Sequence, residues 1–199
     1  SDGVCTGDFV KIMDGDCISG QAEARYCGNR DVAPFLSTGN KLCVKFFSDE
    51  SRNGKGFNAS FQAVDHPARP KDPCGSTITA TVGLLASPNY PEPYPTNELC
   101  NMTIKTLEGP IKLNFEYFDI GKDANCDEDY LLLHGDSDVS KLCGSNLPKA
   151  YNVSGNMLQL SFKSGQQNLN KLGFIATYVS GKGNSSTLMY IYAVYIKSA

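Results

Sequence analysis

Cys126-Asp127-Glu128-Asp129-Tyr130-Leu131, followed by Cys143-Gly144, reveals the organisation of this chain because the same stretch occurs twice. Its counterpart is Cys5-Thr6-Gly7-Asp8-Phe9-Val10, followed by Cys27-Gly28. The correspondence extends from residues 37–42 to residues 153–158, and from Gly56-Phe57 to Gly173-Phe174. A pattern that returns in register predicts one module present in two copies. Residues 74–117 have no counterpart before Cys5, so we expect the first copy to be the C-terminal half of a module.

Short apolar segments with a two-residue period run through the whole chain. Apolar and polar side chains alternate in residues 9–12, 42–46, 111–115 and 157–162. Such alternation is typical of half-buried strands, and no segment has the 3.6-residue apolar period of a helix. The sequence therefore predicts an all-β fold, with a sandwich favoured over a barrel. Residues 66–73 contain three prolines, which favour extended backbone and predict a linker between the modules.

The cysteines and the glycosylation sequons indicate an extracellular protein. Eight cysteines at repeated spacings, with no Cys-x-x-Cys pair, favour structural disulfides over a zinc site. Asn-x-Ser/Thr sequons begin at Asn58, Asn101, Asn152 and Asn184. Together these features predict a secreted glycoprotein. The net charge of −3 and the scattered Lys and Arg residues argue against a nucleic-acid partner. The longest apolar run is about half the length that crosses a bilayer, so no transmembrane segment is expected.

One family matches the second copy. Its pattern consists of Cys74-Gly75, Ser87-Pro88-Asn89-Tyr90-Pro91, Tyr94-Pro95, Cys100, Phe118-Asp119-Ile120, Cys126, Asp129-Tyr130-Leu131, Cys143-Gly144 and Gly173-Phe174. This pattern resembles a complete CUB domain, and residues 1–65 resemble the C-terminal half of another. The resemblance implies tandem antiparallel β-sandwiches of the jelly-roll type. It divides the chain into a half domain (1–65), a linker (66–73), a complete domain (74–180) and a spacer with a β-prone tail (181–199).

The same resemblance implies a disulfide pattern. It pairs Cys74 with Cys100 and Cys126 with Cys143, and the same mapping pairs Cys5 with Cys27. Cys17 and Cys43 fit no position of the family pattern. A bond between these two is the simplest assignment, because each would otherwise be a free thiol in an oxidising compartment. The alternative is that one of them pairs with a cysteine of a preceding half domain.

A calcium site is also implied by the resemblance, since many CUB domains bind Ca²⁺ through three carboxylates on separate loops. In the second module, two of the three positions hold Gly121 and Gly165, which leaves Asp129 alone, so no Ca²⁺ is expected there. In the first module, Asp8 and Asp49 occupy two of the positions, and the Ser51 carbonyl is a further candidate ligand. The third carboxylate would lie in the absent half. The alternative for Asp8 and Asp49 is that they only stabilise turns.

The residues give no support for catalysis, because neither histidine lies near a nucleophile motif or a pair of carboxylates suited to acid–base chemistry. The leading interpretation is a non-catalytic extracellular module that binds proteins or glycans or assembles with copies of itself. One alternative is the regulatory part of a secreted protease whose catalytic domain lies outside these residues. The other is a subunit of an extracellular fibre assembled by strand donation.

The fibre hypothesis depends on the C-terminal tail. Residues 188–196 are uncharged and strongly β-prone, and their candidate assembly residues are Leu188, Tyr190, Tyr192, Val194 and Ile196. Such a run exposes too many apolar groups and backbone donors to remain unpaired in water. We therefore predict a strand that pairs with another sheet, in this chain or in a neighbouring one. The alternative is that the tail begins a further domain.

Overall fold

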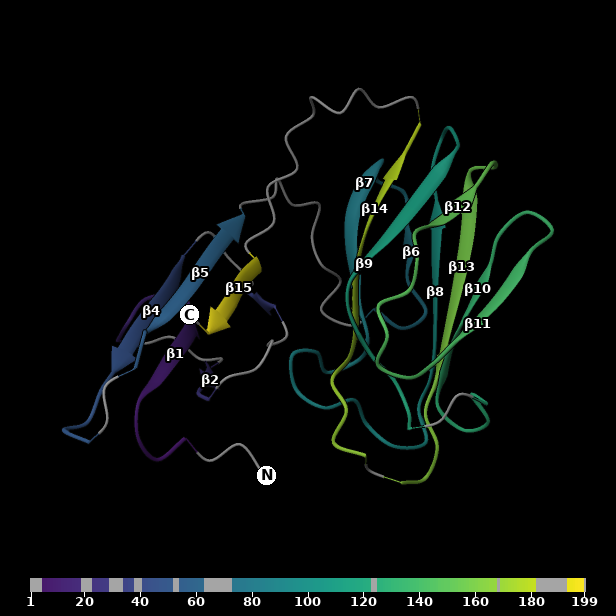
Figure 1. Cartoon of the computed structure of the whole chain (residues 1–199). Coiled ribbons are helices and arrows are strands. Elements are labelled where there is room, and N and C mark those ends of the chain that lie inside the picture. The colour runs from purple at the N-terminus through teal and green to yellow at the C-terminus, as the bar shows by residue number, and fades with distance from the viewer. Residues whose placement is uncertain are drawn as a thin grey trace. The chain divides into compact units, whose positions relative to one another are not determined.

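The computed structural model describes residues 5–18, 23–28, 34–37, 41–51, 54–62, 73–122, 125–167, 169–181 and 193–198. Every regular element in these ranges is a β-strand, which confirms the all-β prediction (Figure 1). The chain divides into two compact units. The first unit contains strands β1–β5 together with the C-terminal strand β15, and the second contains β6–β14.

The first unit has two three-stranded sheets in its described part. Its strands are β1 (Phe9–Asp14), β2 (Glu23–Tyr26), β3 (Phe35–Leu36), β4 (Leu42–Phe47), β5 (Phe57–Gln62) and β15 (Ala193–Ser198). One sheet has the order β2-β1-β4 and the other has the order β3-β15-β5. A small core of Val10, Ile12 and Phe35 is buried in this unit.

The second unit is a larger sandwich. Its strands are β6 (Thr77–Ile78), β7 (Val82–Ala86), β8 (Leu99–Lys105), β9 (Ile111–Asp119), β10 (Tyr130–His134), β11 (Val139–Leu142), β12 (Tyr151–Val153), β13 (Met157–Lys163) and β14 (Gly173–Ser180). One layer has the order β11-β10-β13-β8-β6 and the other has the order β12-β9-β14-β7 (Figure 1). All pairings are antiparallel except that of β6 with β8.

Alternation along β13 explains how this strand of the five-stranded layer contributes to the core. Leu158, Leu160 and Phe162 are completely buried, while Met157, Gln159 and Lys163, which point to the other face, are exposed. The buried set meets the opposite layer through aromatic contacts, with the Phe162 and Phe174 ring centroids 6.4 Å apart. Burial of each such side chain contributes about 1.5–3 kcal/mol to folding. The period of two therefore positions one core face and leaves the other for solvent.

The two units share one pairing scheme. In the first unit Phe9 lies opposite Phe47 and Val10 opposite Phe46, and the equivalent pairs in the second are Tyr130 with Lys163 and Leu131 with Phe162. The sequence repeat thus corresponds to a repeat in strand register. Strand β15 lies between β3 and β5 just as β9 lies between β12 and β14. The tail therefore takes, in the first unit, the place that β9 has in the second.

Four disulfides join the strands and loops. They connect Cys5 with Cys27, Cys17 with Cys43, Cys74 with Cys100 and Cys126 with Cys143. The Cys17–Cys43 bond is additional to the pattern shared by the two copies, and it ties the turn after β1 to strand β4. Each bond closes a loop of 17 to 26 residues. A closed loop of this length restricts the unfolded chain and contributes about 3 kcal/mol in the entropic account.

Alkaline pH is expected to destabilise the second module through Tyr178. This side chain is fully buried, its hydroxyl donates to the Ala80 carbonyl over 2.9 Å, and burial raises its pKa to about 12. The folded-state pKa exceeds that of an unfolded chain, which is near 10. The stabilisation is therefore complete below pH 10 and is lost as pH rises from 10 to 12, by up to about 1.4 kcal/mol per pH unit. Urea unfolding at pH 8 to 11.5 should show a smaller alkaline loss for Tyr178→Phe than for the unchanged chain. Equal losses would contradict this prediction.

Candidate functional site

Asp8 and Asp49 lie together at the end of the first unit where β1 begins and β4 ends. The backbone amide of Asp49 donates to Asp8 Oδ1 over 2.8 Å. This contact forms because Asp8 directly precedes β1 and Asp49 follows its partner strand β4 by two residues. Asp49 is exposed, and Asp8 is half-buried. Two of the three residues predicted to bind Ca²⁺ in the first module are thus brought together.

Ser51, the third candidate, contacts Asp49 rather than Asp8. Its backbone amide and its hydroxyl both donate to Asp49 Oδ1, over 2.7 and 2.8 Å. These hydrogen bonds favour the ionised carboxylate, so they hold the pKa of Asp49 below its usual value. Asp49 is therefore a carboxylate at neutral pH. Asp8, before β1, and Asp49, after β4, thus bring two carboxyl groups to one end of the unit, which is suitable chemistry for a hard divalent cation.

The equivalent residues of the second module form a closed hydrogen-bonded network. Asp129 is buried, and its Oδ1 accepts a short hydrogen bond from the Gly165 amide, which corresponds to the bond between Asp49 and Asp8. Its Oδ2 accepts from the Tyr94 hydroxyl over 3.1 Å, and this hydroxyl accepts from the Gly121 amide over 3.0 Å. Burial, together with the nearby Asp129 carboxylate, raises the pKa of Tyr94, so its hydroxyl remains a donor at neutral pH.

The two glycines of this network disfavour the missing carboxylates, Gly165 by lack of space and Gly121 by its backbone conformation. A Cβ on Gly165 would lie 2.8 Å from Glu128 Cβ, which is closer than real Cβ atoms approach. Gly121 has a φ of +67°, a conformation that a glutamate rarely adopts. The donor set of the second module therefore does not fit Ca²⁺, and Asp129 is used by protein groups instead.

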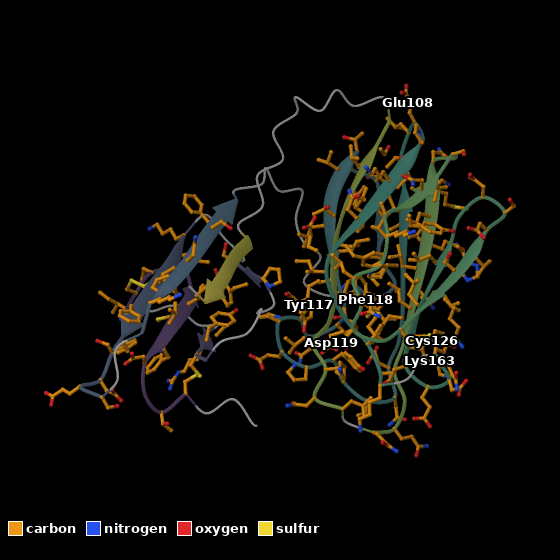
Figure 2. All side chains as sticks on the ribbon, in the orientation of Figure 1. Glu108, Tyr117, Phe118, Asp119, Cys126 and Lys163 are labelled. Carbon is orange, nitrogen blue, oxygen red and sulfur yellow. A yellow bond between two sulfur atoms is a disulfide. The ribbon has the colours of Figure 1, made fainter. Side chains whose placement is uncertain are left out.

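Asp119 is held by a neighbouring cation at the same end of the module. Lys171 Nζ lies 2.6 Å from Asp119 Oδ1, and the Ser145 hydroxyl donates to the same oxygen over 2.6 Å. Figure 2 places Asp119, Cys126 and Lys163 at the end of the sandwich opposite Glu108. Sequence reasoning missed Lys171 and the Tyr94 hydroxyl, because both act on residues distant in the sequence. In the described part of the chain, no group of three His, Cys, Asp or Glu side chains could hold a metal ion.

The remaining predicted site residues are distributed over both units. Asn58, Asn101 and Asn152 are exposed on β5, β8 and β12, while Asn184 lies outside the described residues. Among the tail residues, Val194 and Ile196 belong to β15, where they lie opposite Phe61 and Ala59 of β5. Leu188, Tyr190 and Tyr192 lie outside the described residues. No helix in the described ranges has the length and apolar character that spanning a membrane requires.

Comparison with known proteins agrees with this fold. The family model "CUB domain" matches residues 1–61 and 74–178. Mouse Tolloid-like protein 2 is 33% identical over 181 residues, which are 88% of this chain and 17% of that protein. Human Procollagen C-endopeptidase enhancer 2 is 32% identical over 187 residues, 90% of this chain and 45% of that protein. Dog Cubilin is 32% identical over 162 residues, 79% of this chain and 4% of that protein. The chain thus spans less than half the length of these relatives.

A solved structure supports the same assignment. The MASP-1 CUB2 domain bound to Ca²⁺ is 30% identical, with a TM-score of 0.51, and the match covers 54% of this chain and 99% of that domain. The sheet topology and the disulfides define a disulfide-linked β-sandwich module, and the relatives that it matches are extracellular proteins. The chain belongs to the CUB domain family.

Proposed function

We propose that this chain is an extracellular, non-catalytic interaction protein, and that it binds a partner protein through the loop end of its first module. The observation that carries this proposal is the meeting of Asp8 and Asp49 at an exposed loop end. The equivalent end of the second module is closed by its own side chains. A solved relative of this fold binds Ca²⁺. In this proposal Ca²⁺ binds in the first module, where it orders the loops that carry Asp8 and Asp49 and that contact the partner.

The partner can be sought with the immobilised chain on an array of extracellular protein domains, in Ca²⁺ and again in EDTA. Binding that is lost in EDTA, and lost in the Asp8→Asn variant, supports the proposal. A signal that persists in EDTA or in Asp8→Asn places the contact elsewhere. Selective binding to a parallel glycan array, with no protein signal, would assign the glycan alternative instead.

Calcium is expected to stabilise the first unit through Asp49. A ligand that binds only the folded state adds about 2.7 kcal/mol when its concentration is a hundred times its Kd. Asp49→Asn keeps an oxygen for Ser51 but removes the negative charge, so it should abolish the Ca²⁺-dependent rise in Tm measured by calorimetry. Glu50→Gln, at the exposed adjacent position, is the matched control and should retain the rise. An equal response of both variants, or no response of the unchanged chain, contradicts the assignment.

Exchange of β15 between copies is a second candidate function, because it would link chains into an assembly. The observation favouring it is that β15 pairs with β3 and β5 although the whole second unit separates them in the sequence. A strand on such a connection can reach an identical site in a neighbouring chain, and head-to-tail exchange without closure extends into a filament. Sedimentation over a hundred-fold concentration range should reveal species larger than a monomer. A monomer throughout that range would exclude exchange.

A further inference from the structure

The sequon at Asn101 lies on the outer face of the five-stranded layer of the second unit (Figure 1). Strand β8 buries Cys100, Met102 and Ile104, so Asn101 and Thr103 between them point to the opposite side, where Asn101 is exposed. The asparagine and the hydroxyl residue of a sequon are two positions apart, which is also the side-chain repeat of a strand. A glycan on Asn101 therefore projects away from the core, and the fold accommodates it without moving a buried residue.

The same face carries most of the exposed apolar surface of this unit. The described part of the second unit exposes five large apolar side chains, Leu99, Leu107, Val139, Leu147 and Met157. Three of them, Leu99, Val139 and Met157, belong to β8, β11 and β13 and share the face of Asn101. In the other layer, none of the strands β7, β9, β12 and β14 has an exposed large apolar side chain. The outer face around Asn101 is thus the apolar side of the sandwich.

Asn101 occupies an inner strand of this layer, since β8 has β13 on one side and β6 on the other. Across β13 it lies opposite Ser161, which in turn lies opposite Leu132 of β10. Along its own strand it follows Leu99, which is 66% exposed. Sugars on Asn101 Nδ2 can therefore extend over Ser161 towards Leu132 or along β8 over Leu99. The C–H faces of sugar rings can lie on apolar side chains while their hydroxyl groups remain in water.

We propose that Asn101 carries an N-linked glycan that covers the outer face of the five-stranded layer. In the transfer, Asn101 Nδ2 attacks C1 of a lipid-linked oligosaccharide diphosphate. A C–N bond forms, the bond between C1 and the diphosphate oxygen breaks, and the lipid diphosphate and one amide proton leave. The site goes beyond the proposed partner contact, because it lies in the second unit and uses no acidic loop residue.

Peptide mapping of the full chain, secreted from cultured animal cells, tests the modification. After reduction, trypsin releases residues 72–105, which contain Asn101 as their only sequon. An amidase that removes N-glycans in heavy-oxygen water leaves a labelled aspartate at each glycosylated asparagine, so this peptide should carry the label. Thr103→Ala breaks the sequon and should lose the label, whereas Thr103→Ser, the matched control, should retain it. An unlabelled peptide from the unchanged chain overturns the proposal, and this measurement needs no variant to fold.

Binding of an apolar fluorescent dye tests the covering of the face. Asn101→Gln removes the glycan and should raise dye fluorescence at least about 1.5-fold, because Leu99 and Met157 become accessible. Asn152→Gln is the matched control, because it removes the sequon on the layer that has no exposed large apolar side chain, and it should leave the signal unchanged. Leu99→Glu added to Asn101→Gln should lower the signal again. Equal signals from Asn101→Gln and Asn152→Gln overturn the proposal.

Discussion

Removal of residues 193–198 is expected to unfold the first unit and to leave the second module folded. Strand β15 is the middle strand of the β3-β15-β5 sheet and pairs with all six residues of β5. Without it, β3 and β5 lose their shared partner, and their backbone groups have no ladder in which to pair. The small core of Val10, Ile12 and Phe35 cannot offset this loss alone.

Calorimetry with hydrogen exchange should show this loss as the disappearance of the first-unit transition and of protection in β5. Tyr195→Pro should act like the deletion, because proline removes a backbone donor from the ladder opposite Ser60. Tyr195→Val keeps the donor and a strand-forming residue and should preserve the transition. If the shortened chain retained both transitions and full protection of β5, β15 would not be a structural part of the first unit.

The tail illustrates how much of this fold could be predicted. Its uncharged, β-prone composition predicts a strand, and residues 193–198 form one. The sequence left open whether this strand joins the first module of its own chain or that of a neighbouring one, because pairing between segments far apart in sequence depends on which edges the rest of the fold leaves open. The equivalence of β15 and β9 became visible only when both sheets could be compared.

Strand β4 shows a second limit of sequence reasoning. The alternation of residues 42–46 predicts a strand with one inward face, and the structure contains that strand as β4. Val44 and Phe46 do lie at inward positions, but both are exposed. Alternation determines which side chains share a face, whereas burial depends on what the opposite layer and the adjacent strand supply.

Asp129 shows which contacts of the candidate site the sequence predicts and which it does not. The glycines at positions 121 and 165 predict that the second module lacks a calcium site, because neither can supply a carboxylate. The sequence did not reveal that Tyr94, 35 residues away, donates its hydroxyl to the remaining carboxylate. Tyr94 could be predicted only as a core aromatic, because the position of its hydroxyl depends on packing against Phe162, at a ring distance of 5.1 Å. Long-range polar contacts of this kind leave no periodic signal in the sequence.

Replacement of Asp129 by alanine is expected to lower the free energy of unfolding of the second module by about 3 kcal/mol. The change removes the acceptor of two donors, the buried Tyr94 hydroxyl and the partly buried Gly165 amide. Each unsatisfied buried group costs about 1–3 kcal/mol. Asp129→Asn keeps one oxygen acceptor and should cost less. Urea unfolding at pH 7 gives these differences directly.

Asp136 provides the matched control, because its carboxylate also accepts two backbone amides, those of Ser154 and Gly155, but it does so in solvent. Water can replace it as the acceptor, so Asp136→Ala should cost at most about 1 kcal/mol. The ratio between the two losses measures what burial adds to an otherwise similar set of hydrogen bonds. Equal losses at Asp129 and Asp136 would show that the Tyr94 network does not hold this end of the sandwich, and that its loops are fixed by the surrounding strands alone.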